Sequence, residues 1–312
     1  MTIKKTYKPL LLLLLVVLLA MSGCGAEKDV QNTKDAGQPF QLTLTDDLGR
    51  EVCLERKPER IVSLAPSNTE MLFALGLDEQ IVGVSEHCNY PAAALEKAKA
   101  GTFSEPNLEL IVSLNPHLVV AGHFHEEKLA RLEELGIPVL VLNPSTVEEI
   151  YASLELLGEA AQVEENAHRL VAQMRERMRA VEQKMAHLST RRRVYYEVYA
   201  DPLMSVGRTS VIHELIEIAG GYNIFADVEA PYPKITAEAV VDRDPEVIIF
   251  PNYHGTEGVL ANEIIQRPGW ESISAIKNER VVGVSPDKFS RPGPRVVEAV
   301  EELAAILYPE IK

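Results

Sequence analysis

Runs of continuously apolar residues alternate along this chain with segments in which apolar residues recur every three or four positions. Seven runs are rich in β-branched, leucine or aromatic residues: 60–65, 80–85, 118–122, 138–142, 194–199, 245–250 and 280–284. Such runs predict buried strands. Strands that are apolar throughout and alternate with helices favour a parallel sheet covered on both faces. We therefore expect an α/β fold.

Helical segments lie between the strands. Four of them are bounded by proline, glycine or polar residues: 66–76, 126–135, 211–219 and 293–307. Ser145-Thr-Val-Glu148 has the pattern of a capping box, which predicts a further helix through about Ala161.

The longest helical pattern lies between the two halves of the chain. Its apolar residues form one stripe: Val163, Ala167, Leu170, Val171, Met174, Met178, Val181, Met185 and Leu188. Charged residues occupy the other face, as in an amphipathic helix. About 25 residues would make a rod roughly 37 Å long. We expect this helix, 163–188, to connect an N-terminal lobe, 40–162, with a C-terminal lobe, 189–312; the alternative is a core helix of one lobe.

One pattern occurs twice, 129 residues apart. The first copy begins at Glu109 and leads to Pro116, and the second begins at Glu238 and leads to Pro245. Each copy is an acid that opens a short apolar helix, then a proline that ends it, then a buried strand. One copy in each half predicts two similar, doubly wound (Rossmann-like) lobes joined by the rigid helix, with a cleft between the lobes where a small ligand would bind.

The first 39 residues have a different character. Three lysines and the apolar run Leu10–Ala20 fit a secretory signal, and the run is too short to span a bilayer. Met21-Ser-Gly-Cys24 resembles a bacterial lipobox, although Met21 stands where leucine is usual. We expect a signal peptide over 1–23, lipidation of Cys24, and a polar tether over 24–39 that reaches roughly 20 Å from the membrane. A plain signal peptide with an incidental cysteine is the alternative.

The net charge and the cysteine content limit the possible partners and the possible disulfides. Removal of residues 1–23 takes away three lysines and no acids, so the formal net charge falls from −15 to −18. This acidity argues against nucleic acid as a partner and against broad contact with an anionic membrane. Cys53 and Cys88 are the only other cysteines, and we expect no disulfide between them.

In open α/β sheets, ligands bind beyond the carboxyl ends of the strands. Only 6% of the chain is aromatic, yet aromatic residues recur there: Tyr90, Phe103, Phe124, Tyr199, Tyr232, Tyr253 and Phe289. Large rings suit a large, partly apolar ligand. For any single ring, the alternative is that it caps a strand or closes a loop.

The histidines are weaker candidates. His123-Phe-His125 has a spacing seen in zinc sites, but Gly122 indicates that the strand ends before them, which favours a surface loop. His87 and His254 are weaker candidates still, as axial ligands of a metal in a bound cofactor. The common dinucleotide-binding, nucleophile-elbow, zinc-protease and phosphate-loop motifs are absent, which argues against an enzyme.

Several of these motifs together resemble the substrate-binding lipoproteins of ABC importers for cobalamin, haem and iron–siderophore complexes. The resemblance covers about 60–309 and rests on five segments: Ser63-Leu-Ala-Pro-Ser-Asn-Thr-Glu70, Gly83-Val-Ser-Glu-His-Cys-Asn-Tyr-Pro91, Asn107-Leu-Glu109 with Pro116, Gly220-Gly-Tyr-Asn-Ile224, and the second copy of the repeat at Glu238. It implies two α/β lobes joined by one long helix that close only slightly on the ligand. It implies no cofactor and no catalytic residue, because these proteins bind and deliver.

By this resemblance, Glu109 and Glu238 dock the protein onto a dimeric permease with its ATPase subunits. The alternative is that each acid only complements a helix dipole. The resemblance also implies that a monomer works outside the cytoplasm, anchored to the cell membrane through Cys24.

Cobalamin binders are the most similar members. They place rings around the corrin at positions that match Tyr90, Phe103 and Tyr232, although tryptophan is common at the last two. We expect these three, together with His123, Tyr199, Phe289 and Arg291, to contact cobalamin or a related corrinoid such as cobinamide. A ferric siderophore bound by Arg208, Lys234, Lys288 and Arg291 is the second choice, and haem ligated by Tyr or His is the third. A lipid-anchored metal-dependent enzyme that uses His123 and His125 is a different class of protein and remains open.

Overall fold

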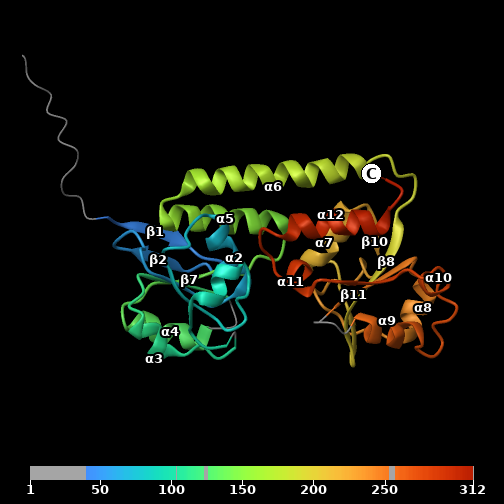
Figure 1. Cartoon of the computed structure of the whole chain (residues 1–312), viewed down its shortest axis with the longest axis horizontal. Coiled ribbons are helices and arrows are strands. Elements are labelled where there is room, and N and C mark those ends of the chain that lie inside the picture. The colour runs from blue at the N-terminus through green and yellow to red at the C-terminus, as the bar shows by residue number, and fades with distance from the viewer. Residues whose placement is uncertain (1–39, 103, 123–125, 253–256, 312) are drawn as a thin grey trace, which may run out of the picture. The chain divides into compact units, whose positions relative to one another are not determined.

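The N-terminal lobe is built on a five-stranded parallel sheet (Figure 1). The computed structural model describes residues 40–102, 104–122, 126–252 and 257–311, which belong to one compact unit, Phe40–Lys312. Along the sheet the order is β5 (Ala98–Lys99), β4 (Ile81–Val84), β3 (Ile61–Ser63), β6 (Leu118–Ala121) and β7 (Val139–Val141). The strands β3, β6 and β7 are buried at every position, as expected for a sheet covered on both faces.

Helices cover both faces of this sheet. One face packs with α2 (Pro66–Ala74) and α5 (Val147–Ala161), and the other with α3 (Leu108–Ser113) and α4 (Glu126–Glu134). An antiparallel hairpin, β1 (Leu42–Thr45) and β2 (Glu51–Leu54), precedes β3, and the 3₁₀ helix η1 (Ala92–Glu96) precedes β5.

The C-terminal lobe repeats the arrangement. Its parallel sheet has the order β10 (Gly221–Asn223), β8 (Arg192–Ala200), β11 (Val247–Pro251) and β12 (Val281–Val284), with β9 (Leu203–Ser205) antiparallel to β8. The order β4-β3-β6-β7 in the first sheet therefore matches the order β10-β8-β11-β12 in the second: one later strand lies on one side of the first strand, and two lie on the other side. The helices are α7 (Val211–Ile218), α8 (Ala237–Arg243), α9 (Glu257–Ile265), α10 (Ser274–Lys277), α11 (Pro286–Phe289) and α12 (Val296–Leu307).

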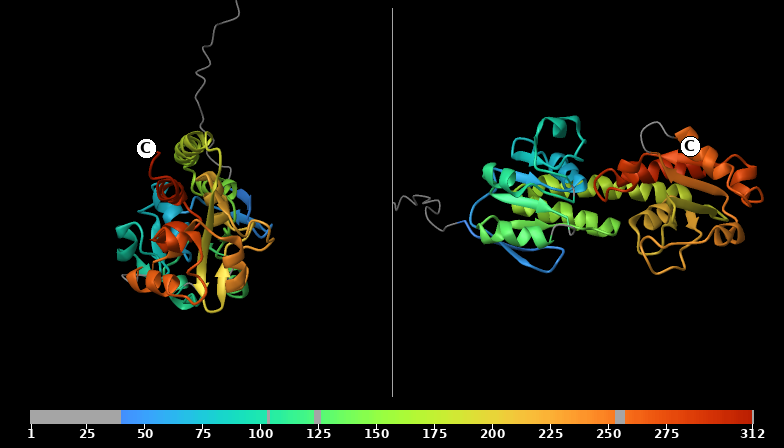
Figure 2. Two further views of the ribbon diagram at one scale, coloured as in Figure 1. Left: turned by 90° about the vertical axis from the view of Figure 1, so that its right-hand side faces the viewer. Right: turned by 90° about the horizontal axis from the view of Figure 1, so that it is seen from below.

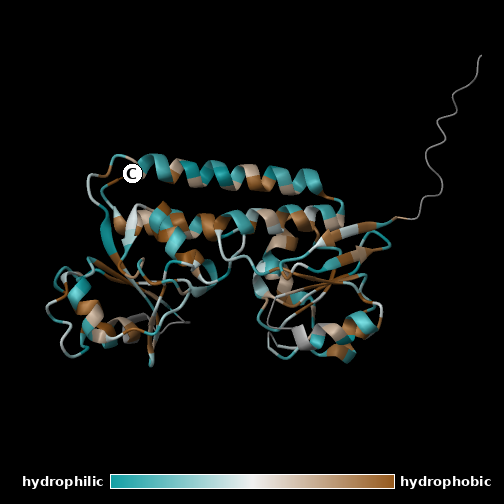
Figure 3. Cartoon of the chain, turned by 180° about the vertical axis from the view of Figure 1, so that it is seen from behind, coloured by the Kyte–Doolittle hydropathy of each residue, from teal (hydrophilic) through white to brown (hydrophobic). Residues whose placement is uncertain are grey.

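The predicted connecting helix is α6 (Glu164–Met185), which runs along both lobes (Figures 1 and 2). It packs against α5 of the N-terminal lobe and against α7 and α12 of the C-terminal lobe. Its buried residues belong to the predicted stripe: Ala167, Val171, Met174, Met178, Val181 and Met185. Its other side is mostly hydrophilic (Figure 3). With 22 residues, the helix is about 33 Å long.

The internal repeat is present at the level of the backbone. Glu109 and Glu238 both occupy the second position of their helices, after the capping residues Asn107 and Thr236. Each cap accepts a hydrogen bond from the N–H three residues later. Asn115 and Asp244 precede the two prolines and have φ of 47° and 41°. Asn and Asp tolerate this left-handed conformation better than other side chains.

The capping-box prediction at Ser145 was wrong by one residue. Thr146 is the cap of α5 and accepts from the N–H of Glu149, while the Glu149 carboxylate accepts from the N–H and hydroxyl of Ser145. The sequence analysis also missed β1, β2, β5, β9 and β10. These are short or peripheral strands whose apolar runs are broken by polar residues or glycine.

Candidate functional site

A large cavity is lined by residues of both lobes. Its volume is about 870 Å³, within the usual range for small-molecule sites. The N-terminal lobe contributes Ala65, Pro66, Ser67, His87, Ser104, Gly122, Leu142, Asn143, Pro144 and Ser145. The C-terminal lobe contributes Thr209, Ser210, Val211, Pro231, Tyr232, Ser290, Arg291 and Pro292. The wall therefore lies beyond carboxyl ends of the strands, where α2 and α7 begin.

The described wall of the cavity is rich in hydroxyl groups and poor in charge. Six serine and threonine residues line it, together with the phenol of Tyr232. Arg291 is the only Lys, Arg, Asp or Glu among the described lining residues. Such a surface offers many hydrogen bonds to a polar but uncharged ligand.

Arg291 belongs to an ionic cluster that joins the lobes beside the cavity. The interlobe cluster consists of Glu70 and Asn89 from the N-terminal lobe and Asp287, Arg291 and Arg295 from the C-terminal lobe. Glu70 is 3% exposed, and its carboxylate accepts bonds of 3.0 Å from Arg291 and of 2.6 and 2.7 Å from Arg295. Arg291 also donates to Asn89 (2.7 Å) and pairs with Asp287 (2.8 Å). Two arginines are thus matched by two carboxylates.

The predicted ligand-binding residues do not all lie at this cavity. Tyr232 and Arg291 line it. Tyr90 lies in another groove of about 670 Å³ with Glu70 and Arg295, and the Arg295 guanidinium lies 4.0 Å from the centroid of its ring. Phe103 and His123 lie outside the described residues, as do His125 and Cys24.

Phe289 lies in the core rather than at the cavity. Its side chain is fully buried in α11, and its ring is stacked on that of Tyr196 with centroids 6.4 Å apart. Its position after the last strand suggested a ligand contact, but the short helix α11 turns the ring inward. The structure thus gives it a packing role.

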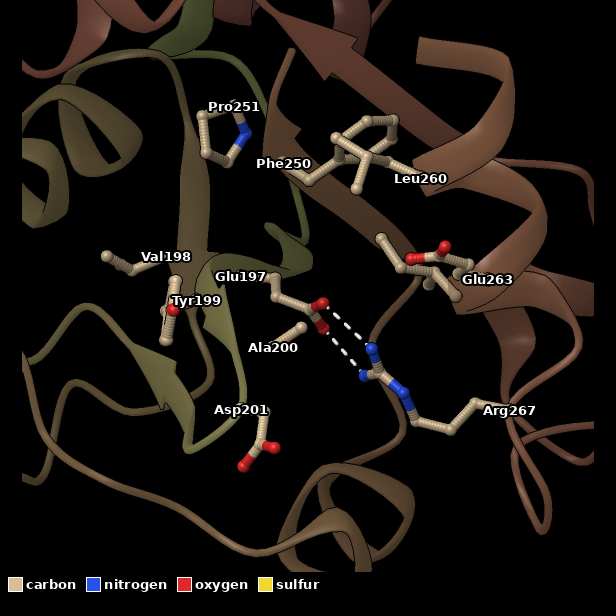
Figure 4. Close-up of a pocket in the computed structure, with 11 residues that line it drawn as sticks. Glu197, Val198, Tyr199, Ala200, Asp201, Phe250, Pro251, Leu260, Glu263 and Arg267 are labelled. Atoms are coloured by element: carbon tan, nitrogen blue, oxygen red, sulfur yellow. Dashed lines mark hydrogen bonds and ion pairs between the residues drawn. The ribbon is translucent and has the colours of Figure 1, made fainter. Parts of the chain in front are cut away.

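Tyr199 lines a separate, smaller cavity of about 300 Å³ within the C-terminal lobe (Figure 4). This cavity lies between the ends of β8 and β11 and helix α9, and its wall includes the buried pair Glu197 and Arg267. The two side chains face each other and form two hydrogen bonds of 2.7 and 2.8 Å.

The sequence analysis missed the serines and threonines of the main cavity. Ser67 lies in the first turn of α2, Ser210 is the cap of α7, and Ser145 precedes the cap of α5. Each follows a predicted strand or opens a predicted helix. Helix-start positions at strand ends were therefore a usable signal, which the emphasis on aromatic rings overlooked.

The two repeated acids are exposed on their helices. Hydrogen bonds from the Glu238 N–H and the Thr236 hydroxyl hold the pKa of the Glu238 carboxyl below its usual value. Glu238 is therefore ionised at neutral pH, as a charge-based docking contact requires.

A second tie between the lobes lies at the start of α5. The N–H of Val147 donates to the carboxylate of Glu214 in α7 at 2.7 Å. Burial raises the pKa of Glu214 above 4.5, the Val147 hydrogen bond opposes this, and Glu148 and Glu149 add to the rise. Because the folded-state pKa is the higher one, the contribution of this group to stability is complete below the unfolded-state pKa and is lost as the pH rises through the folded-state pKa.

Glu214→Gln is therefore expected to raise the Tm at pH 7 by about 1–3 °C and to leave it unchanged near pH 4. The amide oxygen still accepts from Val147 but carries no charge. Glu149→Gln is the matched control, because bonds from Ser145 lower the pKa of Glu149 and the sign is reversed. Scanning calorimetry from pH 4 to 8 checks both, and a lower Tm of Glu214→Gln at pH 7 would contradict the argument.

Other features of the described residues bear on the remaining hypotheses. Cys53 and Cys88 are both free, as expected. Within these residues, no group of three or more His, Cys, Asp and Glu is placed to hold a metal ion. No helix in the described part of the chain is long and apolar enough to cross a membrane.

Comparison with known proteins agrees with the two-lobed architecture. The chain is 34% identical over 310 residues to YvrC of Bacillus subtilis, an uncharacterised ABC transporter substrate-binding lipoprotein, with 96% of each chain covered. The vitamin B12-binding protein BtuF of Vibrio cholerae superposes with a TM-score of 0.70 at 31% identity, over 81% of this chain and 98% of that one. The heme-binding protein RhuT of Roseiflexus sp. RS-1, in apo form, gives a TM-score of 0.73 at 26% identity, over 81% and 99%.

A family model described as periplasmic binding protein matches residues 61–287. This match runs from β3 of the N-terminal lobe to α11 of the C-terminal lobe. Together with the similarity to YvrC over nearly the whole length, it shows that the chain belongs to the periplasmic binding protein family.

Proposed function

We propose that this protein is the substrate-binding lipoprotein of an ABC importer and that it carries cobalamin or a related corrinoid in the cavity between its lobes. The similarity to YvrC supports the transporter role, and the similarity to the Vibrio cholerae vitamin B12-binding protein supports the ligand. The protein binds and delivers its ligand and does not convert it.

The observation that carries the ligand proposal is the wall of the main cavity, where Arg291 is the one Lys, Arg, Asp or Glu among the described lining residues. A corrinoid is a large ring with carboxamide side chains, which donate and accept hydrogen bonds without net charge. The hydroxyl groups of the cavity match such side chains, and its volume of about 870 Å³ lies at the upper end of the range for small-molecule sites. Tyr232 supplies an aromatic surface at the same wall.

A ferric siderophore is less well matched, because its complexes are often anionic and need a basic cleft. Arg208 pairs with Glu229 and Lys288 pairs with Glu302, while Arg291 is neutralised in the interlobe cluster. Neither Arg208, Lys234 nor Lys288 is among the described residues that line the cavity.

Haem is a second candidate ligand, and one observation supports it. His87 and Tyr232 both line the cavity, one from each lobe, and both side-chain types ligate haem iron. A Soret band that shifts in His87→Ala or Tyr232→Phe would identify haem as the ligand.

Calorimetric titration of the purified protein with cyanocobalamin tests the proposal. We expect one-to-one binding with a Kd below about 1 µM, equivalent to about −8 kcal/mol. Tyr232→Ala is expected to weaken binding roughly tenfold through the loss of ring contact. Tyr222→Ala is the matched control, because this exposed tyrosine does not line the cavity. No heat at several temperatures would overturn the corrinoid proposal and leave siderophores and haem to be titrated.

We further propose that Glu109 and Glu238 dock onto the two halves of the permease, which works with its ATPase subunits. Support comes from their matched positions, one on each lobe, and from their exposure. Lipidation of Cys24, the tether over 24–39 and action as a monomer outside the cytoplasm remain part of the same proposal. Mass spectrometry of the mature protein tests the modified cysteine.

A further inference from the structure

The interlobe cluster connects the cavity wall to both lobes. Glu70 lies on α2, whose first residues line the cavity, and Arg291 lines the same cavity from the other lobe. The backbones approach closely here, since a Cβ built on Gly293 would lie 3.4 Å from the carbonyl oxygen of Ser67. A substitution at Glu70 would therefore change the charge next to the cavity wall.

Both terminal nitrogens of Arg291 are engaged within the protein. One terminal nitrogen donates to Glu70 and Asn89, and the other pairs with Asp287 and lies 3.4 Å from the carbonyl oxygen of His87. Its side chain is 15% exposed. An anionic ligand would have to compete with two carboxylates already in contact with this guanidinium.

Glu70 is the carboxylate that both arginines share. Arg295 forms two bonds to it, and Arg291 forms one. Without its charge, Arg291 and Arg295 would face each other with only Asp287 to balance them, and the cluster would carry a net positive charge beside the cavity. Charges in a partly buried site interact strongly because water screens them poorly.

We propose that Glu70 is a specificity-determining residue: by neutralising Arg291 it makes the cavity select uncharged ligands over anionic ones. Glu70 acts through Arg291 and is a positioning residue rather than a ligand contact. This inference rests on the proposed function, because it assumes that the cavity between the lobes is where the ligand binds.

The test compares one neutral and one anionic probe. Cyanocobalamin is neutral overall, and a ferric tris-catecholate complex is trianionic. In Glu70→Gln, we expect affinity for the ferric complex to rise about tenfold or more and affinity for cyanocobalamin to fall. In the double variant Glu70→Gln, Arg291→Gln, where the freed cation is gone, affinity for the ferric complex is expected to return to the wild-type value.

Glu197→Gln is the matched control for lost stability. It removes another buried carboxylate that pairs with an arginine, but within one lobe. A merely structural role of Glu70 would weaken both probes alike and would not reverse in the double variant. Equal affinity of wild type and Glu70→Gln for the ferric complex, or a gain that persists in the double variant, would overturn the inference.

Two further results keep the test decisive. If Glu70→Gln does not fold, Asp287→Asn replaces it, because it removes the other carboxylate paired with Arg291. We expect affinity for the ferric complex to rise in this variant as well, and an unchanged affinity would show that the carboxylates do not restrain Arg291. If wild type does not bind cyanocobalamin, the proposed ligand is wrong, but the response of the ferric complex to these substitutions still decides the role of Glu70.

Discussion

Replacement of both Glu109 and Glu238 by arginine is expected to abolish ligand uptake while ligand affinity stays within about twofold of wild type. Each acid is exposed at the second position of a capped helix, one in each lobe. A dimeric permease would offer one basic site to each. Charge reversal turns both contacts into repulsion, and like charges across an interface cost several kcal/mol. Each single substitution should reduce uptake by about tenfold or more.

Uptake in cells or in liposomes that contain the transporter measures this effect, and calorimetry measures ligand affinity. Glu165→Arg is the matched control, because Glu165 is an exposed acid at the second position of α6. It carries the same loss of helix-dipole complementarity, which amounts to about 0.3–1 kcal/mol, without lying on a repeat helix. Normal uptake by the double variant would show that the two acids only stabilise their helices.

The repeat could be predicted from the sequence because local rules determine it. An acid after a capping residue, an Asn or Asp with positive φ, and a proline before a buried strand each act within a few residues. The long helix was predictable for a similar reason. Apolar residues that recur every three or four positions over six turns indicate an amphipathic helix and no other element.

The interlobe cluster could not be predicted, because its partners are far apart in the sequence. Helix α2 buries five consecutive residues, Asn68–Leu72, so its pattern shows no polar face. Asn68 donates to the carbonyl of Ala121, and Glu70 binds arginines more than 220 residues away. When the hydrogen-bond partners of buried polar residues lie far away in the sequence, the local pattern cannot be told from that of solvent-exposed residues.

For the same reason, the predicted aromatic residues do not all lie at one cavity. The segment before the second repeat helix was identified correctly, and its Tyr232 lines the main cavity. The distance of a ring from the cavity, however, depends on how the following segment turns. A short helix directs Phe289 inward, and the end of β8 directs Tyr199 to a different cavity.

Breaking the ion pair between Glu197 and Arg267 should strongly destabilise the C-terminal lobe. Glu197 is 6% exposed and Arg267 19% exposed in their side chains. The hydroxyl of Tyr195 donates to the same carboxylate, and burial of that phenol together with Glu197 raises the pKa of Tyr195. The guanidinium carbon of Arg267 lies 4.2 Å from the ring centroid of the fully buried Trp270. Removal of the arginine thus leaves a buried carboxylate without its cation and uncovers a core residue.

Arg267→Ala is expected to lower the free energy of unfolding by about 3–5 kcal/mol, the usual cost of an orphaned buried charge, and to lower the Tm by roughly 10 °C. Arg177→Ala, which breaks the exposed pair with Glu301, should cost at most about 1 kcal/mol. The double variant Glu197→Leu, Arg267→Met should recover most of the loss, because no charge is left buried. Urea unfolding followed by circular dichroism gives all three values. If Arg267→Ala were no more costly than Arg177→Ala, water would be solvating Glu197 through the cavity in Figure 4, and the pair would not be a buried one.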